Sequence, residues 1–305
     1  MSGLRSLRLP PPVLRLGARQ LGKRVLNSDL SWEIQRRRLD NVIRASPAPR
    51  GTVIAERDYG GVPARVVTAG GTAPGSARTV VHFHGGGYCV GSGRMALSWA
   101  AGLSAQSGAR VVLPEYRLAP EHPHPAALAD ARATVSALRA DVSPGSMVLS
   151  GDSAGGGLAL ALLIALRDAG EALPAGCVLL SPWLDLGRDW HADATLARRD
   201  VLLSPGWLEA CATAYAGPAK RTDPAISPIL AAHAGLPPLL IQAATHELLV
   251  PDADRLAASA SEAGVDVTYS KWPRMWHDFV LQAGTLAAAD SAVTQAAWFV
   301  SKVTT

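Results

Sequence analysis

Short apolar runs alternate with longer alanine- and leucine-rich stretches along most of the 305-residue chain. The apolar runs are Val80–His84, Arg110–Tyr116, Met147–Ser150, Cys177–Ser181, Leu239–Ala244 and Val265–Trp272. Helical patterns cover Ala126–Leu138, Leu158–Leu166, Asp252–Ala263 and Ala287–Val303. This alternation predicts an α/β fold with a mostly parallel sheet and helices on both faces.

Two earlier runs, Val53–Tyr59 and Arg65–Ala69, open the pattern and are separated by Gly60 and Gly61. The glycine pair predicts a tight turn, so we expect the two runs to pair as an antiparallel hairpin. Together the runs predict an eight-stranded sheet in a single α/β domain over residues 1–305. Folds of this class commonly hold a chain of this length around one core.

The most informative motif is the stretch Gly151–Gly155 (GDSAG), which fits the pattern G-x-S-x-G between an apolar run and a helical stretch. A strand that turns directly into a helix leaves little room for side chains beside the turn. The glycines relieve this crowding, and the turn forces Ser153 into strained backbone geometry. The motif therefore predicts a nucleophile elbow that presents the Ser153 hydroxyl.

A second motif, His84–Gly87 (HGGG), follows an apolar run about seventy residues before Ser153, and it matches the oxyanion loop of lipases and esterases. Successive glycines let backbone N–H groups converge on one point. They also let a substrate carbonyl approach the backbone closely. The two motifs occur in the order that acyl-transfer chemistry of this kind requires.

With HGGG followed by GDSAGG, the chain resembles the hormone-sensitive-lipase family of α/β hydrolases, which includes bacterial carboxylesterases. Glu115–Glu121 (EYRLAPE) resembles the family's D-Y-R-L-A-P-E block, and Asp223–Pro228 resembles a later block. The similarity is nearly continuous from about residue 55 onward. Two departures are Glu115 in place of Asp and Gly157 in place of Asn. The resemblance implies the α/β-hydrolase fold with a helical cap.

The resemblance also implies a catalytic triad in the chain order serine, acid, histidine. His277 matches the family's H-x-F segment near the C-terminus. The family's acid lies about thirty residues before that histidine, which selects Glu247, and one branch of the family uses Glu there. A register shift of one residue would put His246 at that position, where no carboxylate would be available. Asp252 is the fallback, although we expect it to open the following helix.

In this scheme Ser153 attacks an ester carbonyl as His277 takes its proton, and Glu247 orients the imidazole. The oxyanion hole implied by the resemblance comprises Gly85, Gly86, Gly87 and Ala154. Within that set we expect Gly85 mainly to shape the loop. The resemblance makes Asp152 a support of the surrounding backbone that faces away from the substrate.

Residues 1 to about 45 and about 185 to 218 fall outside the sheet pattern and resemble the family's cap. The second segment is rich in Trp, Leu and Ala. Tyr88, Trp183 and Trp207 are candidate walls of an apolar substrate pocket above Ser153, although ordinary packing is the better explanation for any single one of them. We also expect Arg117 and Glu121 to form a structural polar pair beneath the site.

The first fifty residues are rich in arginine. They do not form a secretory signal, because the apolar stretch Leu9–Leu16 is broken by prolines and Arg15. A membrane-surface helix over Val13–Leu26 is an alternative that we do not favour, since basic amphipathic helices are more often solvated faces or lids. A net charge of +4 with no recognition motif argues against a nucleic-acid partner. The sequence leaves a homodimer open.

The three cysteines, Cys89, Cys177 and Cys211, lack the spacing of metal ligands or of a disulfide framework. They suit a reducing cytoplasm. No nucleotide-binding pattern is present, so we expect neither a cofactor nor a metal site.

Together these features predict a serine carboxylesterase that hydrolyses short- to medium-chain esters of small molecules through an acyl-enzyme. The alternatives are an amide or N-acetyl hydrolase, a lipase that acts at a lipid surface, and a catalytically silent ligand-binding relative. Retention of both Ser153 and His277 argues against the last of these.

Overall fold

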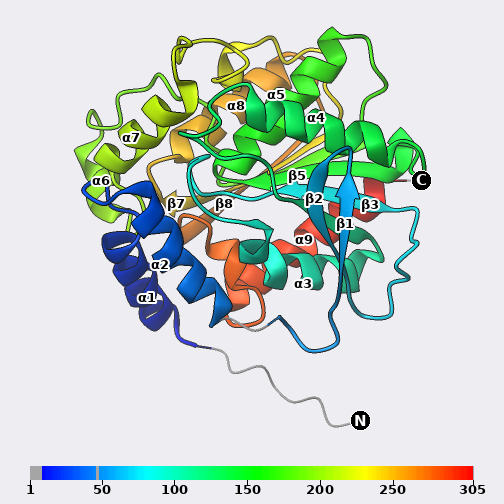
Figure 1. Ribbon diagram of the computed structural model, residues 1–305, viewed down its shortest axis with the longest axis horizontal. Coiled ribbons are helices and arrows are strands. Elements are labelled where there is room, and N and C mark those ends of the chain that lie inside the picture. The colour runs from blue at the N-terminus through cyan, green and yellow to red at the C-terminus, as the bar shows by residue number, and fades with distance from the viewer. Residues whose placement is uncertain (1–8, 46–47, 305) are drawn as a thin grey trace.

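The computed structural model describes residues 9–45 and 48–304, and at its centre lies one eight-stranded sheet (Figure 1). The strands are β1 Val53–Tyr59, β2 Val62–Thr68, β3 Thr79–Phe83, β4 Arg110–Pro114, β5 Met147–Asp152, β6 Gly176–Leu180, β7 Leu239–His246 and β8 Val267–Trp276. Their order is β1-β2-β4-β3-β5-β6-β7-β8. Strand β2 pairs antiparallel with β1 and β4, and the other pairs are parallel. The predicted sheet and its opening hairpin are confirmed.

The last strand is longer than the sequence pattern predicts, and the difference matters for the site. Strand β8 ends at Trp276 instead of Trp272, because its pairing with β7 continues as far as His246. A register irregularity interrupts this pairing near its end. As a result, His277 follows directly on the carboxyl end of a strand.

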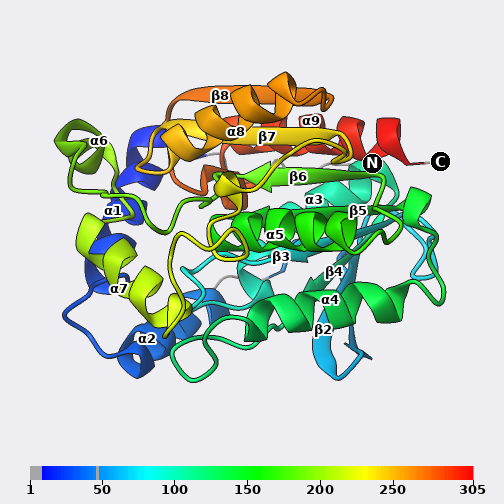
Figure 2. The ribbon, with the colours of Figure 1, turned by 90° about the horizontal axis from the view of Figure 1, so that it is seen from above.

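Helices cover both faces of the sheet, as expected (Figures 1 and 2). Helices α4 (Ala126–Leu138), α5 (Ala154–Asp168) and α8 (Val250–Glu262) pack on one face, and α3 (Leu97–Ser107) and α9 (Ala287–Val303) pack on the other. The apolar strand residues between them are almost completely buried, so each face has its own core. None of the helices in the described part of the chain is long and apolar enough to cross a lipid bilayer.

Four further helices lie together at the end of the sheet where the parallel strands terminate, and we call them the cap helices. They are α1 Pro11–Arg24, α2 Trp32–Arg44, α6 Ala194–Arg199 and α7 Pro205–Ala216 (Figure 2). The indole N–H of Trp207 donates to Gln35 Oε1 at 2.8 Å and joins α7 to α2 inside the protein. The cap is therefore built from two segments that are distant in sequence.

Arg36 of α2 fastens this cap to the body of the protein. Its guanidinium donates to the carbonyl oxygens of Cys89 and Ala119 at 2.8 and 2.7 Å, and it forms an ion pair with Glu121. The expected pair between Arg117 and Glu121 is therefore wrong. Arg117 instead forms an ion pair with Asp130 of α4, with 2.7 Å between the guanidinium nitrogen and Oδ1.

Candidate active site

Ser153 lies at the sharp turn between β5 and α5 and has a positive φ of 52°. For a non-glycine residue this is strained backbone, which is retained where the surrounding structure holds it in place. The surrounding glycines explain how the turn fits. A Cβ atom on Gly151 would overlap the Gly155 carbonyl, and one on Gly155 would overlap the carbonyl of Phe83. Strand, helix and oxyanion loop can approach this closely only without those side chains.

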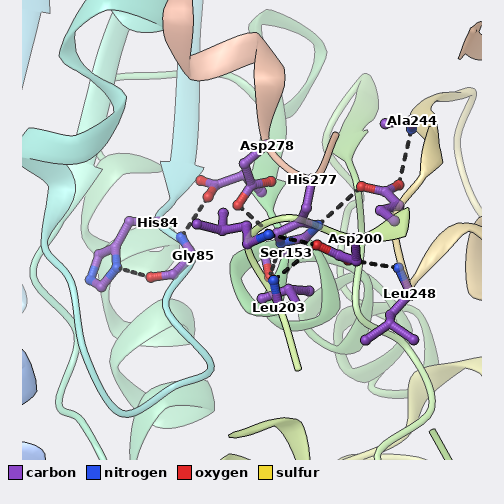
Figure 3. A network of polar contacts seen from close by, with 12 residues as sticks. His84, Gly85, Ser153, Asp200, Leu203, Ala244, Leu248, His277 and Asp278 are labelled. Atoms are coloured by element: carbon purple, nitrogen blue, oxygen red, sulfur yellow. Dashed lines mark hydrogen bonds and ion pairs between the residues drawn. The ribbon is translucent and has the colours of Figure 1, made fainter. Parts of the chain in front are cut away.

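The structure brings three of the predicted site residues into one hydrogen-bonded line (Figure 3). His277 Nε2 lies 2.9 Å from Ser153 Oγ, and His277 Nδ1 lies 3.0 Å from Glu247 Oε2. The second carboxylate oxygen of Glu247 accepts the N–H of Ala244 at 3.0 Å. All three side chains are buried. This arrangement can move a proton from the serine to the imidazole and stabilise the imidazolium that results.

The two other positions weighed for the acid lie elsewhere. His246 contacts Arg15, whose guanidinium is 2.9 Å from its Nδ1. Asp252 lies in the first turn of α8 and accepts two backbone N–H groups, those of Leu184 and Asp185, at 2.8 and 2.9 Å. Burial raises the pKa of Asp252 to about 6. Its carboxylate holds the start of the segment that leads into the cap.

Three of the four predicted oxyanion donors have free N–H groups. Among the described residues, none accepts a hydrogen bond from the N–H of Gly86, Gly87 or Ala154. The N–H of Gly85 differs, because it donates to Asp152 Oδ2 at 2.9 Å. Gly85 therefore cannot donate to an oxyanion in this arrangement. It fixes the loop instead, as expected for a residue that shapes it.

Asp152 and His82 form the support beneath this loop. The Asp152 carboxylate accepts the Gly85 N–H through Oδ2 and lies 3.0 Å from His82 Nε2 through Oδ1. Both side chains are buried. Asp152 thus faces the oxyanion loop, and a Cβ atom on Gly85 would overlap its carboxylate.

Asp278 is a site residue that sequence reasoning missed. Its Oδ2 lies 3.1 Å from His277 Nε2, the same nitrogen that faces Ser153 (Figure 3). Its Oδ1 is buried and has no hydrogen-bond partner among the described residues. The sequence signal for Asp278 is its position directly after His277. In the H-x-F segment this position is the variable one, so the segment itself predicts no role for it.

The electrostatics at this point are unusual, because two carboxylates contact one imidazole. Burial works to lower the pKa of His277, but Asp278 and Glu247 outweigh it and hold that pKa well above its ordinary value. Burial also raises the pKa of Asp278.

The cap helices close over Ser153 and leave a cavity of about 40 Å³ beside it. Leucines of the cap and Trp207 line this cavity, together with Gly86 and His277. Tyr88 and Trp183 do not contribute to its lining. Tyr88 stacks on Tyr215 with ring centroids 3.6 Å apart, and Trp183 is fully buried. These two side chains therefore lie outside the closed cavity, and their role as walls of the substrate pocket stays a prediction.

A much larger apolar cavity of about 720 Å³ adjoins the small one beneath α1 and α2. Leu21, Leu39 and Met95 line both cavities, as do His277 and Asp278. Apolar side chains dominate its walls, so it suits a hydrocarbon group. The catalytic imidazole thus lies where the two cavities meet.

Comparison with known proteins identifies the family to which this fold is similar. Residues 80–281 match a family model described as alpha/beta hydrolase fold. An acetyl-hydrolase of Streptomyces hygroscopicus is 42% identical over 66% of this chain and 67% of its own length. An esterase of Acinetobacter venetianus is 30% identical over 87% of each chain. The crystal structure of an esterase from the bacterial hormone-sensitive lipase family superposes with a TM-score of 0.89 at 32% identity, covering 97% of this chain and 99% of the other.

Proposed function

The chain belongs to the hormone-sensitive-lipase family of α/β hydrolases, and from that membership we propose that Ser153, His277 and Glu247 act as its nucleophile, base and acid. It is a carboxylic ester hydrolase. We propose short- to medium-chain acyl esters of small molecules as its substrates. The observation that carries the proposal is the hydrogen-bonded line from Ser153 Oγ through His277 to Glu247.

The reaction proceeds in two halves. Ser153 Oγ attacks the ester carbonyl carbon while His277 Nε2 takes the hydroxyl proton, and the N–H groups of Gly86, Gly87 and Ala154 stabilise the oxyanion. The C–O bond to the alcohol then breaks, and His277 returns the proton to the leaving alcohol. Water repeats the sequence on the acyl-enzyme and releases the acid and free Ser153.

Substrate entry requires the cap to move. The 40 Å³ beside Ser153 is little more than the volume of one water molecule in the liquid, about 30 Å³. Ser153 itself is only 4% exposed. Opening of α1 or α7 would join this space to the apolar cavity, which then receives the hydrocarbon part of the ester.

A second activity, amide hydrolysis, is favoured by one observation, the unpartnered Oδ1 of Asp278. An amide leaving group carries an N–H that an ester lacks, and a buried donor without an acceptor costs about 1–3 kcal/mol. Because Asp278 lies beside Nε2, its carboxylate can accept that N–H while Nε2 protonates the nitrogen. Ester turnover gains nothing from this contact.

We also propose a cytoplasmic location. Cys89 and Cys211 are both buried, and the Cys89 thiol lies 4.0 Å from the Cys211 carbonyl oxygen, yet the two thiols are free. Neighbouring thiols that stay reduced suit a reducing compartment. Thiol titration of the freshly purified, unfolded protein should detect both thiols as free, whereas a disulfide between them would contradict this location.

The function is tested with p-nitrophenyl esters from acetate to palmitate and with p-nitroacetanilide. The wild type should hydrolyse the short and medium esters, and Ser153→Ala should abolish turnover of every substrate. Asp278→Ala should lower anilide turnover relative to ester turnover by about tenfold or more, the cost of one buried unpaired donor. Absence of ester hydrolysis in a folded wild type would refute the esterase, and an unchanged anilide-to-ester ratio would refute the role of Asp278.

A further inference from the structure

A third cavity, of about 760 Å³, lies between α1 and the segment around α6, next to the site. The two helices are neighbours in the cap (Figures 1 and 2). The walls of this cavity carry three arginines, Arg15 and Arg19 from α1 and Arg198 from α6. These helices are almost 180 residues apart in the sequence and meet only in the folded cap. No step of ester hydrolysis described above uses these arginines. Their convergence on one cavity is unusual, because like charges repel.

The positive charge of this cavity is not neutralised by the protein. None of its three arginines forms an ion pair with a carboxylate of the described residues. Asp200 is the only acidic residue among the described residues that line it. Its carboxylate already accepts three backbone N–H groups, those of Leu202, Leu203 and Leu248, at 2.8–2.9 Å (Figure 3).

Neighbouring groups hold one of the three arginines, Arg15, in place. Arg15 donates to the carbonyl oxygen of Arg199 at 2.8 Å and contacts His246 Nδ1. Burial lowers the pKa of His246, and the charges of Arg15, Arg199 and Arg274 lower it further. The imidazole therefore stays neutral and accepts the hydrogen bond from Arg15. It orients one guanidinium without contributing a charge of its own.

The cavity also adjoins the reaction centre. Leu26, Leu202 and Leu203 line both it and the small cavity that contains Ser153. No other described residue lines both cavities. The three leucines therefore separate the space beside Ser153, where the ester bond would lie, from the space beside the arginines. The movement of the cap that admits a substrate would displace the same leucines.

We propose that this arginine-lined cavity binds a carboxylate or phosphate group carried by the ester substrate, at the end remote from the scissile bond. The proposal rests on the ester hydrolase function above and narrows its substrate class to anionic esters. Guanidinium groups recognise both anions through paired, charge-assisted hydrogen bonds. A neutral ester can make no such bonds, so the arginines would favour the anionic one.

The test compares p-nitrophenyl monoesters of glutaric, adipic and suberic acid with neutral p-nitrophenyl esters of equal chain length. The ratio of kcat/KM for each anionic and neutral pair is measured in the wild type and in Arg19→Gln/Arg198→Gln. Arg57→Gln is the matched control, because it removes an exposed arginine from β1 at the other end of the sheet. We expect the wild type to favour one anionic length, and the double variant to lower that ratio by about tenfold, with neutral turnover unchanged.

Several outcomes would overturn the proposal. One is a wild type with no preference at any length, and another is a double variant that changes the ratio no more than Arg57→Gln does. If the double variant loses only binding to vesicles of phosphatidylglycerol, while the ratio stays constant, the arginines face a lipid surface and the substrate proposal is wrong. Absence of turnover of both the anionic and the neutral esters by a folded wild type would instead refute the underlying esterase. The four readouts are therefore distinguishable.

Discussion

Replacing Glu247 with Gln tests the proposed acid with almost no change of shape. The carboxylate accepts two hydrogen bonds, from the Ala244 N–H and from His277 Nδ1, both at 3.0 Å. A glutamine side chain has one accepting oxygen and one donating NH₂ group. It cannot satisfy both donors, and the Ala244 N–H is fixed within β7. Each orientation of the amide therefore has a definite cost.

If the glutamine oxygen faces Ala244, its NH₂ group forces the proton of His277 onto Nε2, and the imidazole can no longer accept the Ser153 proton. In a serine protease the loss from this wrong tautomer is about ten thousandfold. If the oxygen faces Nδ1 instead, the buried Ala244 N–H is left unpaired at about 1–3 kcal/mol. We therefore expect kcat/KM to fall by between about fivefold, the equivalent of about 1 kcal/mol, and about ten thousandfold.

The assay is the hydrolysis of p-nitrophenyl butyrate at saturating and limiting substrate, with a thermal melt of each protein. Asp252→Asn serves as the comparison, because it removes the other buried carboxylate near the end of β7. It should lower the melting temperature more than it lowers kcat/KM. A Glu247→Gln protein within about fivefold of the wild type would refute the assignment, since either orientation of the amide predicts a larger loss.

Three further changes follow from the same geometry. Asp278→Asn should shift the acidic limb of the pH profile of kcat/KM to lower pH, because His277 must be neutral to act and Asp278 raises the pKa of His277. An acidic limb that does not move would contradict this charge effect. Gly86→Ala should lower kcat by about a hundred- to a thousandfold, since the φ of 109° is unfavourable for alanine and the added Cβ would overlap the Val90 carbonyl. Near-normal kinetics would exclude Gly86 as an oxyanion donor. Arg36→Ala should lower the melting temperature by a few degrees through the loss of its bonds to loop carbonyls, and an unchanged melt would show that other contacts hold the cap.

The sequence located those parts of the site whose chemistry constrains the chain locally. The close approach of strand and helix at Ser153 requires Gly151 and Gly155. The five-residue motif GDSAG therefore predicts the nucleophile elbow by itself. The glycines of the oxyanion loop could be predicted for a similar reason, because a Cβ atom on Gly86 or Gly87 would overlap neighbouring atoms. The resemblance to the family, which places the acid about thirty residues before the histidine, selected Glu247, the residue that contacts the imidazole.

What the sequence did not indicate depends on contacts between distant segments. Arg36 pairs with Glu121 across 85 positions, so Glu121 was assigned to its near neighbour Arg117 instead. Tyr88 and Trp183 have the composition of pocket walls, but their rings are used in packing against other aromatic side chains. Periodicity and composition do not encode which aromatic residue faces a cavity.

The most direct test of the central claim is to react the protein with diethyl p-nitrophenyl phosphate and to measure its intact mass and its peptide map. We expect one diethylphosphoryl group per chain, located on Ser153, in parallel with complete loss of esterase activity and absent from the Ser153→Ala protein. Loss of activity with no adduct on Ser153, or esterase activity that persists in Ser153→Ala, would contradict the claim that Ser153 is the nucleophile.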